Sequence, residues 1–353
     1  MRGTQNVEPS EKAKTGSAIT TPIDIGSDRH PTMRAIVQGR YGPPEEVLKL
    51  DVIDRPAPGD GEVLVRVRAA VVGGTDWHLL RGLPYAARLV TGLRKPKNRV
   101  PGLELAGTVV AVGRDVESLK EGDEVFGWAG GSFAEYAAVP EQQLLTKPAN
   151  LTLAQAAVVP IAAFTALQGV RLGRIQPGQK VLITGASGGV GLYVVQIAKL
   201  SGAEVTGVCS TAKMDLVRSL GADHVVDYTE EHFTRSGERY DVFIDLYGNP
   251  SLSDCRRALK PRGTLVLIGG TGGKWLMGVD RWMRAKLLAP FLRLEVRPLI
   301  HKDSRQDLAT IRELIETGKL APVVGRTFPL AGVAEAVQFV REGRAHGQVS
   351  ITI

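Results

Sequence analysis

The sequence from Val181 to Lys199, VLITGASGGVGLYVVQIAK, predicts the fold class most directly. An apolar run of strand type leads into a glycine-rich turn, and an amphipathic helical pattern follows. Such a turn lets backbone N–H groups approach a pyrophosphate at the positive end of the helix. Ala186 stands where the strict G-x-G-x-x-G pattern has its first glycine. A tight turn without a ligand is the alternative. We predict dinucleotide contacts at Gly188, Gly189, Val190 and Gly191.

Strands and helices alternate after this turn. AEVTGVCS, HVVDY, YDVFIDLYG and GTLVLIGG are typical of buried strands, and helical patterns such as TAKMDLVRSLGA lie between them. This order predicts right-handed βαβ units and a doubly wound parallel sheet, so the fold class is α/β. From Met33 to about Lys147, short strands bounded by Gly, Pro and Asp indicate a second, β-rich unit. The alternating QVSITI at the C-terminus is expected to return to that unit.

The chain is expected to divide into three parts. They are a disordered N-terminal extension over residues 1–32, a β-rich catalytic domain over 33–155 completed by 305–353, and a nucleotide-binding domain over 156–304. The extension is polar and has no apolar core, so it does not have the pattern of a secretory signal. Pro160 and two glutamines interrupt the apolar window from Leu151 to Val170, which favours a helix buried between domains over a membrane span.

Composition fits this plan. The 353 residues are 43% hydrophobic and 23% charged, which is typical of a globular protein of about two domains. Two cysteines, Cys209 and Cys255, are too few for a disulfide framework, so we expect a reducing, cytoplasmic setting. The net charge of +7 could attract nucleic acid, anionic lipid or phosphorylated ligands, but lysine and arginine are spread along the whole chain. We therefore expect no nucleic-acid partner.

The end of the second predicted strand of the nucleotide-binding domain bears on the cofactor. A site that prefers NAD places an acidic residue there to bind the ribose hydroxyls. The chain instead reads VCSTAKMD, and Ser210 and Lys213 can hold a 2′-phosphate that a carboxylate would repel. The alternative is that Lys213 is an exposed lysine in a first helical turn. The missing acid favours NADPH.

A series of further motifs runs in order from about Met33 to Ile353: VPGLELAGTVVAVG, GDEVFG, GSFAEYAAVP, KPANLTLAQAAVVPIAAFTAL, GASGGVGLYVVQIAK, LGADHVVDY and GRAHGQVSITI. With them the chain resembles the medium-chain dehydrogenase/reductase superfamily, and within it the zinc-independent quinone oxidoreductases and double-bond reductases. The resemblance implies a GroES-like β-barrel catalytic domain, a Rossmann domain and a cleft between them. It also implies a homodimer or homotetramer.

The same resemblance assigns cofactor contacts. The family's grip on the phosphate of NADPH matches Ser210, Lys213 and Tyr228, and Arg344 is a further candidate. The nicotinamide side of the cleft matches two more positions, which are Thr165 and Gly269.

The loop AAVVGGTDWHLLRG, from Ala69 to Gly82, bears on a metal. In the zinc alcohol dehydrogenases that this loop resembles, it reads Cys-Gly-Thr-Asp-x-His, and its cysteine binds zinc. Here Gly73 takes the cysteine's place. The second ligand there is the histidine of a Gly-His-Glu, and this chain has Leu103 in its place, followed by Glu104. Because a catalytic zinc needs about three protein ligands, no metal is expected.

Thr75 and His78 keep positions that relay protons in those zinc enzymes. Without zinc to stabilise an alkoxide, alcohol oxidation is disfavoured. Hydride addition to an enone or quinone instead gives a delocalised oxyanion that hydrogen bonds can stabilise. Asp76 and His78, with Thr75, are therefore candidates for substrate orientation or proton delivery. The alternatives are that Asp76 caps a turn and that His78 packs at a helix start.

Residues 272–300 are basic and carry apolar residues at helical spacing until Pro290 breaks the pattern. This stretch is expected to pack at a domain or subunit interface; a lid over an apolar pocket and a helix that touches lipid are the alternatives.

Together these observations predict an NADPH-dependent, zinc-independent oxidoreductase that transfers a hydride to a quinone or α,β-unsaturated carbonyl of apolar character. An NADP-linked alcohol or aldehyde dehydrogenase is one alternative. A non-catalytic protein that binds NADPH or nucleic acid is the other.

Overall fold

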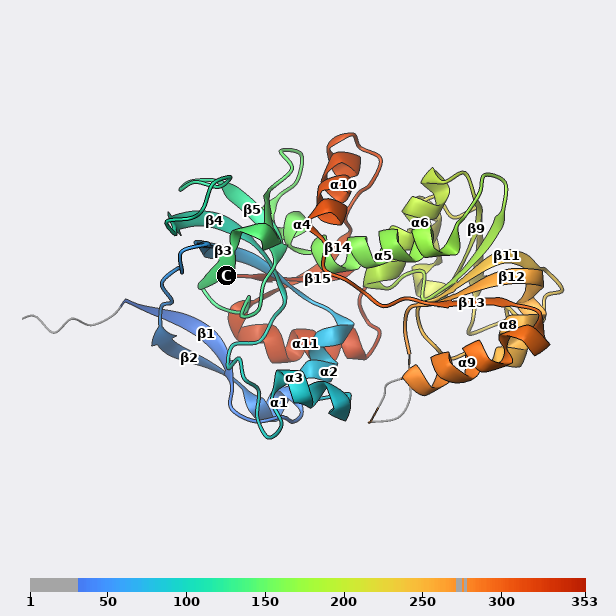
Figure 1. The fold of residues 1–353 in the computed structure, drawn as a ribbon, viewed down its shortest axis with the longest axis horizontal. Coiled ribbons are helices and arrows are strands. Elements are labelled where there is room, and N and C mark those ends of the chain that lie inside the picture. The colour runs from blue at the N-terminus through green and yellow to red at the C-terminus, as the bar shows by residue number, and fades with distance from the viewer. Residues whose placement is uncertain (1–30, 271–274, 276–277) are drawn as a thin grey trace, which may run out of the picture. The chain divides into compact units, whose positions relative to one another are not determined.

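The computed structural model describes residues 31–270, 275 and 278–353, so the predicted extension over residues 1–32 lies almost wholly outside the described residues. The body from Thr32 to Ile353 contains two large sheets and a two-stranded sheet (Figure 1). One large sheet is parallel and the other is mostly antiparallel. The predicted α/β class with a separate β-rich unit is confirmed.

The parallel sheet has the strand order β10-β9-β8-β11-β12-β13. Its strands are β8 (Lys180–Thr184), β9 (Glu204–Cys209), β10 (His224–Asp227), β11 (Tyr240–Asp245), β12 (Leu259–Leu267) and β13 (Glu295–Pro298). Of these six strands, β8 comes first along the chain but lies in the middle of the sheet, and the strand order reverses between β8 and β11. Ligands of open parallel sheets bind at such a switch point, beyond the carboxyl ends of the strands.

Helices cover both faces of the parallel sheet. Val181 and Ile183 of β8 belong to the core that contains α5 and α6, whereas Leu182 between them belongs to the core with α8 and α9. Figure 1 accordingly shows these two pairs of helices on opposite sides of the strands. The helices of this domain are α5 (Pro160–Gly173), α6 (Gly189–Leu200), α7 (Met214–Ser219), α8 (Leu252–Ala258) and α9 (Val279–Leu292).

The course of α9 corrects the prediction that Pro290 breaks the helical pattern, because the helix continues to Leu292. Proline has no N–H to donate to the carbonyl oxygen of Lys286, but only Phe291 and Leu292 follow it, so this interruption falls at the end of the helix. Arg293 follows in the left-handed conformation (φ 51°), and its N–H bonds to the carbonyl oxygen of Pro290 at 3.2 Å. No helix among the described residues is long and apolar enough to cross a membrane.

The β-rich unit has the sheet order β14-β15-β3-β4-β5-β7, and β6 also pairs with β3. β15 pairs antiparallel with β3, so QVSITI returns to this unit as its alternation predicts. The strands are β1 (Thr32–Gln38), β2 (Leu48–Asp54), β3 (Glu62–Val72), β4 (Glu104–Val112), β5 (Glu124–Trp128), β6 (Tyr136–Pro140), β7 (Leu144–Thr146), β14 (Val324–Pro329) and β15 (Gln348–Thr352). The helices are α1 (Pro44–Val47), α2 (Gly74–Leu80), α3 (Arg88–Thr91), α4 (Leu153–Ala157), α10 (Arg305–Glu316) and α11 (Val333–Arg341), and the 3-10 turns are η1 (Tyr85–Ala87), η2 (Glu141–Gln143) and η4 (Leu330–Gly332). A further 3-10 turn, η3 (Thr211–Lys213), belongs to the parallel-sheet domain.

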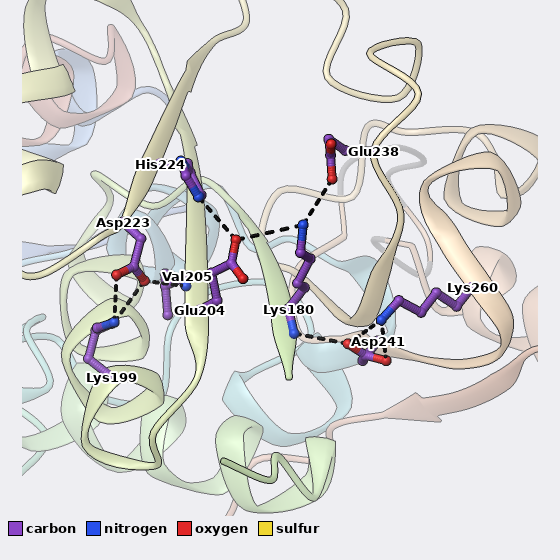
Figure 2. A network of polar contacts seen from close by, with 9 residues as sticks. All are labelled: Lys180, Lys199, Glu204, Val205, Asp223, His224, Glu238, Asp241 and Lys260. Carbon is purple, nitrogen blue, oxygen red and sulfur yellow. Dashed lines mark hydrogen bonds and ion pairs between the residues drawn. The ribbon is translucent and has the colours of Figure 1, made fainter. Parts of the chain in front are cut away.

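A polar network joins the amino ends of the parallel strands (Figure 2). The carboxylate of Asp241 accepts from the backbone N–H of Lys180 at 2.9 Å and pairs with Lys260 at the same distance. Asp223 and Lys199 form a second ion pair at 2.7 Å. These contacts hold the strands in register at the edge opposite the candidate site, so we assign them a structural role.

Candidate functional site

The glycine-rich turn connects β8 to α6 at the switch point of the sheet. Gly185 has a left-handed backbone (φ 69°), and its carbonyl oxygen accepts from the N–H of Gly188 at 2.9 Å. A Cβ atom on Gly191 would lie 2.1 Å from that same oxygen, so only glycine lets the helix pack this closely on the turn. No side chain of the described residues caps the start of α6. The first-turn N–H groups of Gly189 and Val190 can therefore serve an anion.

Lys213 and Arg344 come together although they are far apart in sequence. Ser210 follows β9 and precedes the 3-10 turn η3, which ends at Lys213. The ammonium group of Lys213 donates to the carbonyl oxygen of Gly343 at 2.7 Å, directly before Arg344. Burial lowers the pKa of Lys213. Arg344 is exposed and pairs with Glu342 at 3.1 Å.

Tyr228 lies beside these residues, because its N–H donates to the carbonyl oxygen of Cys209 at the end of β9. Its ring is 60% exposed and free to contact a ligand. Asp227, which the sequence did not single out, ends β10 at the same edge, in register with Cys209. Its carboxylate accepts hydrogen bonds from the hydroxyls of Thr211 and Thr229, which lower its pKa. The carboxylate of Asp227, which lies beside the end of β9, is thus already bound by threonines.

Thr165, on α5, joins a hydrogen-bonded chain that sequence reasoning missed. Its hydroxyl donates to the carbonyl oxygen of Ile161 at 2.6 Å and lies 2.9 Å from Nδ1 of His301. Nε2 of His301 lies 3.0 Å from the carboxylate of Asp303. The hydroxyl of Thr165 and the carboxylate of Asp303 thus lie at the two ring nitrogens of His301 and fix the orientation of the ring. The ring also stacks on Phe164, with 5.2 Å between centroids.

Two buried carboxyl groups, Asp76 and Glu104, occupy the region that carries zinc in the zinc alcohol dehydrogenases. Glu104 accepts from the N–H of Ile161 at 2.8 Å, and burial raises its pKa to about 8, with a further rise from Asp76 and Asp303. Asp76 accepts from the N–H of Gly73 at 2.8 Å, and burial raises its pKa to about 7. Both groups are thus protonated for a large part of the time at neutral pH.

The three predicted catalytic residues differ in their surroundings. Asp76 caps the start of α2, which is the structural alternative that the sequence left open. His78 is half-buried, and burial and the charge of Arg81 lower its pKa. Nδ1 of His78 is buried and has no hydrogen-bond partner among the described residues. Thr75 lies exposed in the first turn of the same helix.

The side chains at this place do not fit a zinc ion. Gly73 and Leu103 carry no ligating atom. Within the described part of the chain, no group of three or more His, Cys, Asp or Glu side chains is arranged to hold a metal. Two carboxyls of raised pKa and a histidine of lowered pKa can instead offer hydrogen bonds to an oxygen that gains negative charge.

Gly269 lies where β12 ends beside β11. A Cβ atom there would lie 1.8 Å from the carbonyl oxygen of Leu246, so the two strand ends approach too closely for a side chain. Asp245, at the end of β11, accepts from Thr184 at 2.8 Å and pairs with Arg281 of α9 at 2.8 Å. This fully buried carboxylate fixes the carboxyl edge of the sheet and holds α9 against it.

The comparisons with known proteins agree with this geometry. The family model described as "Alcohol dehydrogenase GroES-like domain" matches residues 59–149, and the model described as "Zinc-binding dehydrogenase" matches residues 220–350. The chain is similar to the quinone-oxidoreductase QR1 of Triphysaria versicolor, named chloroplastic, with 32% identity over 90% of this chain and 98% of the relative. It is 33% identical to the NADPH-dependent alkenal/one oxidoreductase of Arabidopsis thaliana, also named chloroplastic, over 97% of this chain and 84% of the relative. The solved quinone oxidoreductase of Coxiella burnetii matches with a TM-score of 0.82 and 26% identity, over 92% of this chain and all of that one.

Proposed function

Because the chain belongs to the medium-chain dehydrogenase/reductase superfamily, on its quinone oxidoreductase-like branch, we propose that it reduces quinones or α,β-unsaturated carbonyls with NADPH and without zinc. One observation carries this proposal. At the place of the family's zinc the chain offers Gly73 and Leu103, which have no ligating atoms, beside the buried carboxyls of Asp76 and Glu104. A conjugated acceptor needs no metal, because its oxyanion is delocalised and hydrogen bonds stabilise it.

The nicotinamide dinucleotide, when bound, supplies the hydride. The N–H groups at the start of α6 and the glycine-rich turn would hold its pyrophosphate. Lys213 uses one donor on Gly343, so two remain for a 2′-phosphate, and Arg344 follows in the same segment. Ser210 and Tyr228 complete this grip at the ends of β9 and β10. The carboxylate of Asp227 lies at the same edge, but threonines bind it, so it is not free to bind the ribose hydroxyls of NADH.

Other residues of the site would orient the substrate. Thr165 is held by Ile161 and His301, and Asp303 orients His301 in turn. We propose that Thr165 positions the nicotinamide and the acceptor, together with the backbone at Gly269. His78 and the protonated carboxyl of Asp76 are the groups that can give a hydrogen bond or a proton to the reduced acceptor.

The domain limits, the oligomeric state and the cellular location are also proposed. The domain limits at residues 155 and 305, and a homodimer or homotetramer, are proposed from the family resemblance. A cytoplasmic location is proposed from the two cysteines alone, and the two relatives described above are named chloroplastic.

The test follows NADPH absorbance in chelator-treated buffer with an ortho-quinone, an aliphatic enone and a saturated aldehyde in turn. Turnover of the quinone or the enone alone is expected. Turnover of the aldehyde would favour the alcohol dehydrogenase alternative. Tight NADPH binding without turnover of any acceptor would favour a binding protein.

A further inference from the structure

The helix α9 exposes an apolar side that no described residue covers. Met283, Leu287 and Phe291 recur at every fourth position, so they lie along one side of the helix. Their exposed fractions are 66%, 74% and 84%. Ala285, by contrast, is fully buried in the core under the sheet. The helix is therefore anchored by one side and free to meet a partner with the other.

A second exposed apolar group lies on α3, next to the turn that contacts the segment before α9. Leu89 and Val90 of α3 and Leu93 just after it are 74%, 75% and 67% exposed. The preceding turn η1 carries Tyr85, whose ring meets the ring of Trp275 edge-on, with 5.4 Å between centroids. Trp275 comes just before α9 in the chain. We call the six aliphatic, methionine and phenylalanine side chains of the two groups, which are Leu89, Val90, Leu93, Met283, Leu287 and Phe291, the apolar face.

The surroundings of the apolar face are cationic. Residues 77–103 hold six lysines and arginines and no aspartate or glutamate. Arg94, Lys95 and Lys97 are exposed, and no carboxylate among the described residues pairs with them. On α9, Lys286 is exposed, and Asp280 is neutralised by Arg284 at 2.6 Å.

The positive charge around the apolar face distinguishes between the partners that could bind there. A second copy of the chain, docked through the same face about a two-fold axis, would bring like charges together. A bilayer that contains anionic lipid can bind both the apolar side chains and the cationic ones. The apolar side chains enter the headgroup region, and the lysines and arginines pair with lipid phosphates. We propose that the apolar face docks this protein on an anionic membrane surface, without spanning it.

The experiment uses the full chain with vesicles of phosphatidylcholine, with and without phosphatidylglycerol, in flotation. Binding is expected to the vesicles with phosphatidylglycerol, and it should weaken as salt screens the charges. Each basic residue near an anionic surface is worth about fivefold in partition. The variant Arg94→Gln/Lys95→Gln/Lys97→Gln should therefore bind at least tenfold more weakly.

Leu287→Glu/Phe291→Glu should abolish flotation, whereas Leu200→Glu should not. Leu200 is also exposed, at 47%, but it ends α6 on the other side of the parallel sheet. All three variants should keep wild-type turnover of a water-soluble quinone, which shows that they fold. Equal flotation of the wild type and the Leu287→Glu/Phe291→Glu variant would overturn the proposal. So would a lack of flotation together with a smaller mass of that variant in light scattering, because the face would then join two copies of the chain.

Discussion

Replacing Glu104 by glutamine tests the buried carboxyl beside the candidate site. Burial raises the pKa of Glu104 from 4.5 to about 8 in the folded protein. The unfolded chain has the ordinary value, so it releases the proton at a lower pH than the folded protein does. Between these two values the folded state binds more protons, and its stability therefore falls as the pH rises. Glutamine cannot ionise, so Glu104→Gln should lack this loss.

The size of the effect follows from the two pKa values. Integrating the difference in protons bound by Glu104 from about pH 6 to about pH 9 gives a loss of about 2 to 3 kcal/mol in the wild-type free energy of unfolding from this group alone. Glutamine can still accept the N–H of Ile161, which Glu104 accepts at 2.8 Å. Asp76, whose pKa burial raises to about 7, should add a loss of about 1.4 kcal/mol over the same range in both the wild type and the variant.

The assay is urea denaturation at both pH values, followed by tryptophan fluorescence. Relative to the wild type, the variant should gain about 2 to 3 kcal/mol in its free energy of unfolding between the lower and the higher pH. Glu121→Gln, at an exposed glutamate, is the control and should follow the wild type. Parallel losses in the wild type and in Glu104→Gln would refute the reasoning.

Three further predictions concern the dinucleotide and the residues that orient it. Lys213→Ala should weaken NADPH binding about tenfold to a hundredfold, because a charge-assisted hydrogen bond is lost, and should hardly affect NADH; calorimetry that finds equal losses would contradict the assignment. His301→Gln should lower kcat more than it raises KM, and Asp303→Asn should do so to a smaller extent, in steady-state assays; unchanged kcat in both would leave Thr165 without this support. Gly191→Ala should lower the free energy of unfolding by about 2 kcal/mol or more because its Cβ meets a backbone oxygen, whereas Gly61→Ala, with nothing within 4 Å, should stay within about 1 kcal/mol in urea melts.

Local patterns predicted the parts of this protein that depend on neighbouring residues. The turn from Val181 to Lys199 showed its strand, its glycines and its helix, because strand and helix periodicities and the need for a bare backbone are visible within a few residues. The lack of an acid after β9 was visible for the same reason. The fold class followed from the alternation of such segments.

Contacts across the chain were beyond those patterns. Thr165 and His301 are 136 residues apart, and Glu104 and Ile161 are 57 apart, so their meeting depends on the tertiary fold. One signal for His301 was available: a histidine directly after the last strand of a parallel sheet lies at the edge where ligands bind. Asp227 could not be placed beside Cys209 before the strand order was known.

A single residue, Ile161, links the two halves of the candidate site. The N–H of Ile161 donates to Glu104, and its carbonyl oxygen accepts from Thr165, whose hydroxyl is in turn contacted by His301. Glu104 therefore holds the same residue whose carbonyl oxygen orients Thr165, in the first turn of α5. With Glu104 protonated, no negative charge at that position opposes the charge that grows on a reduced acceptor. Ionisation would add such a charge in a buried place, where it is weakly screened. A reductase with this site should therefore lose activity on the alkaline side of the pKa of Glu104, for electrostatic reasons that need no change of fold.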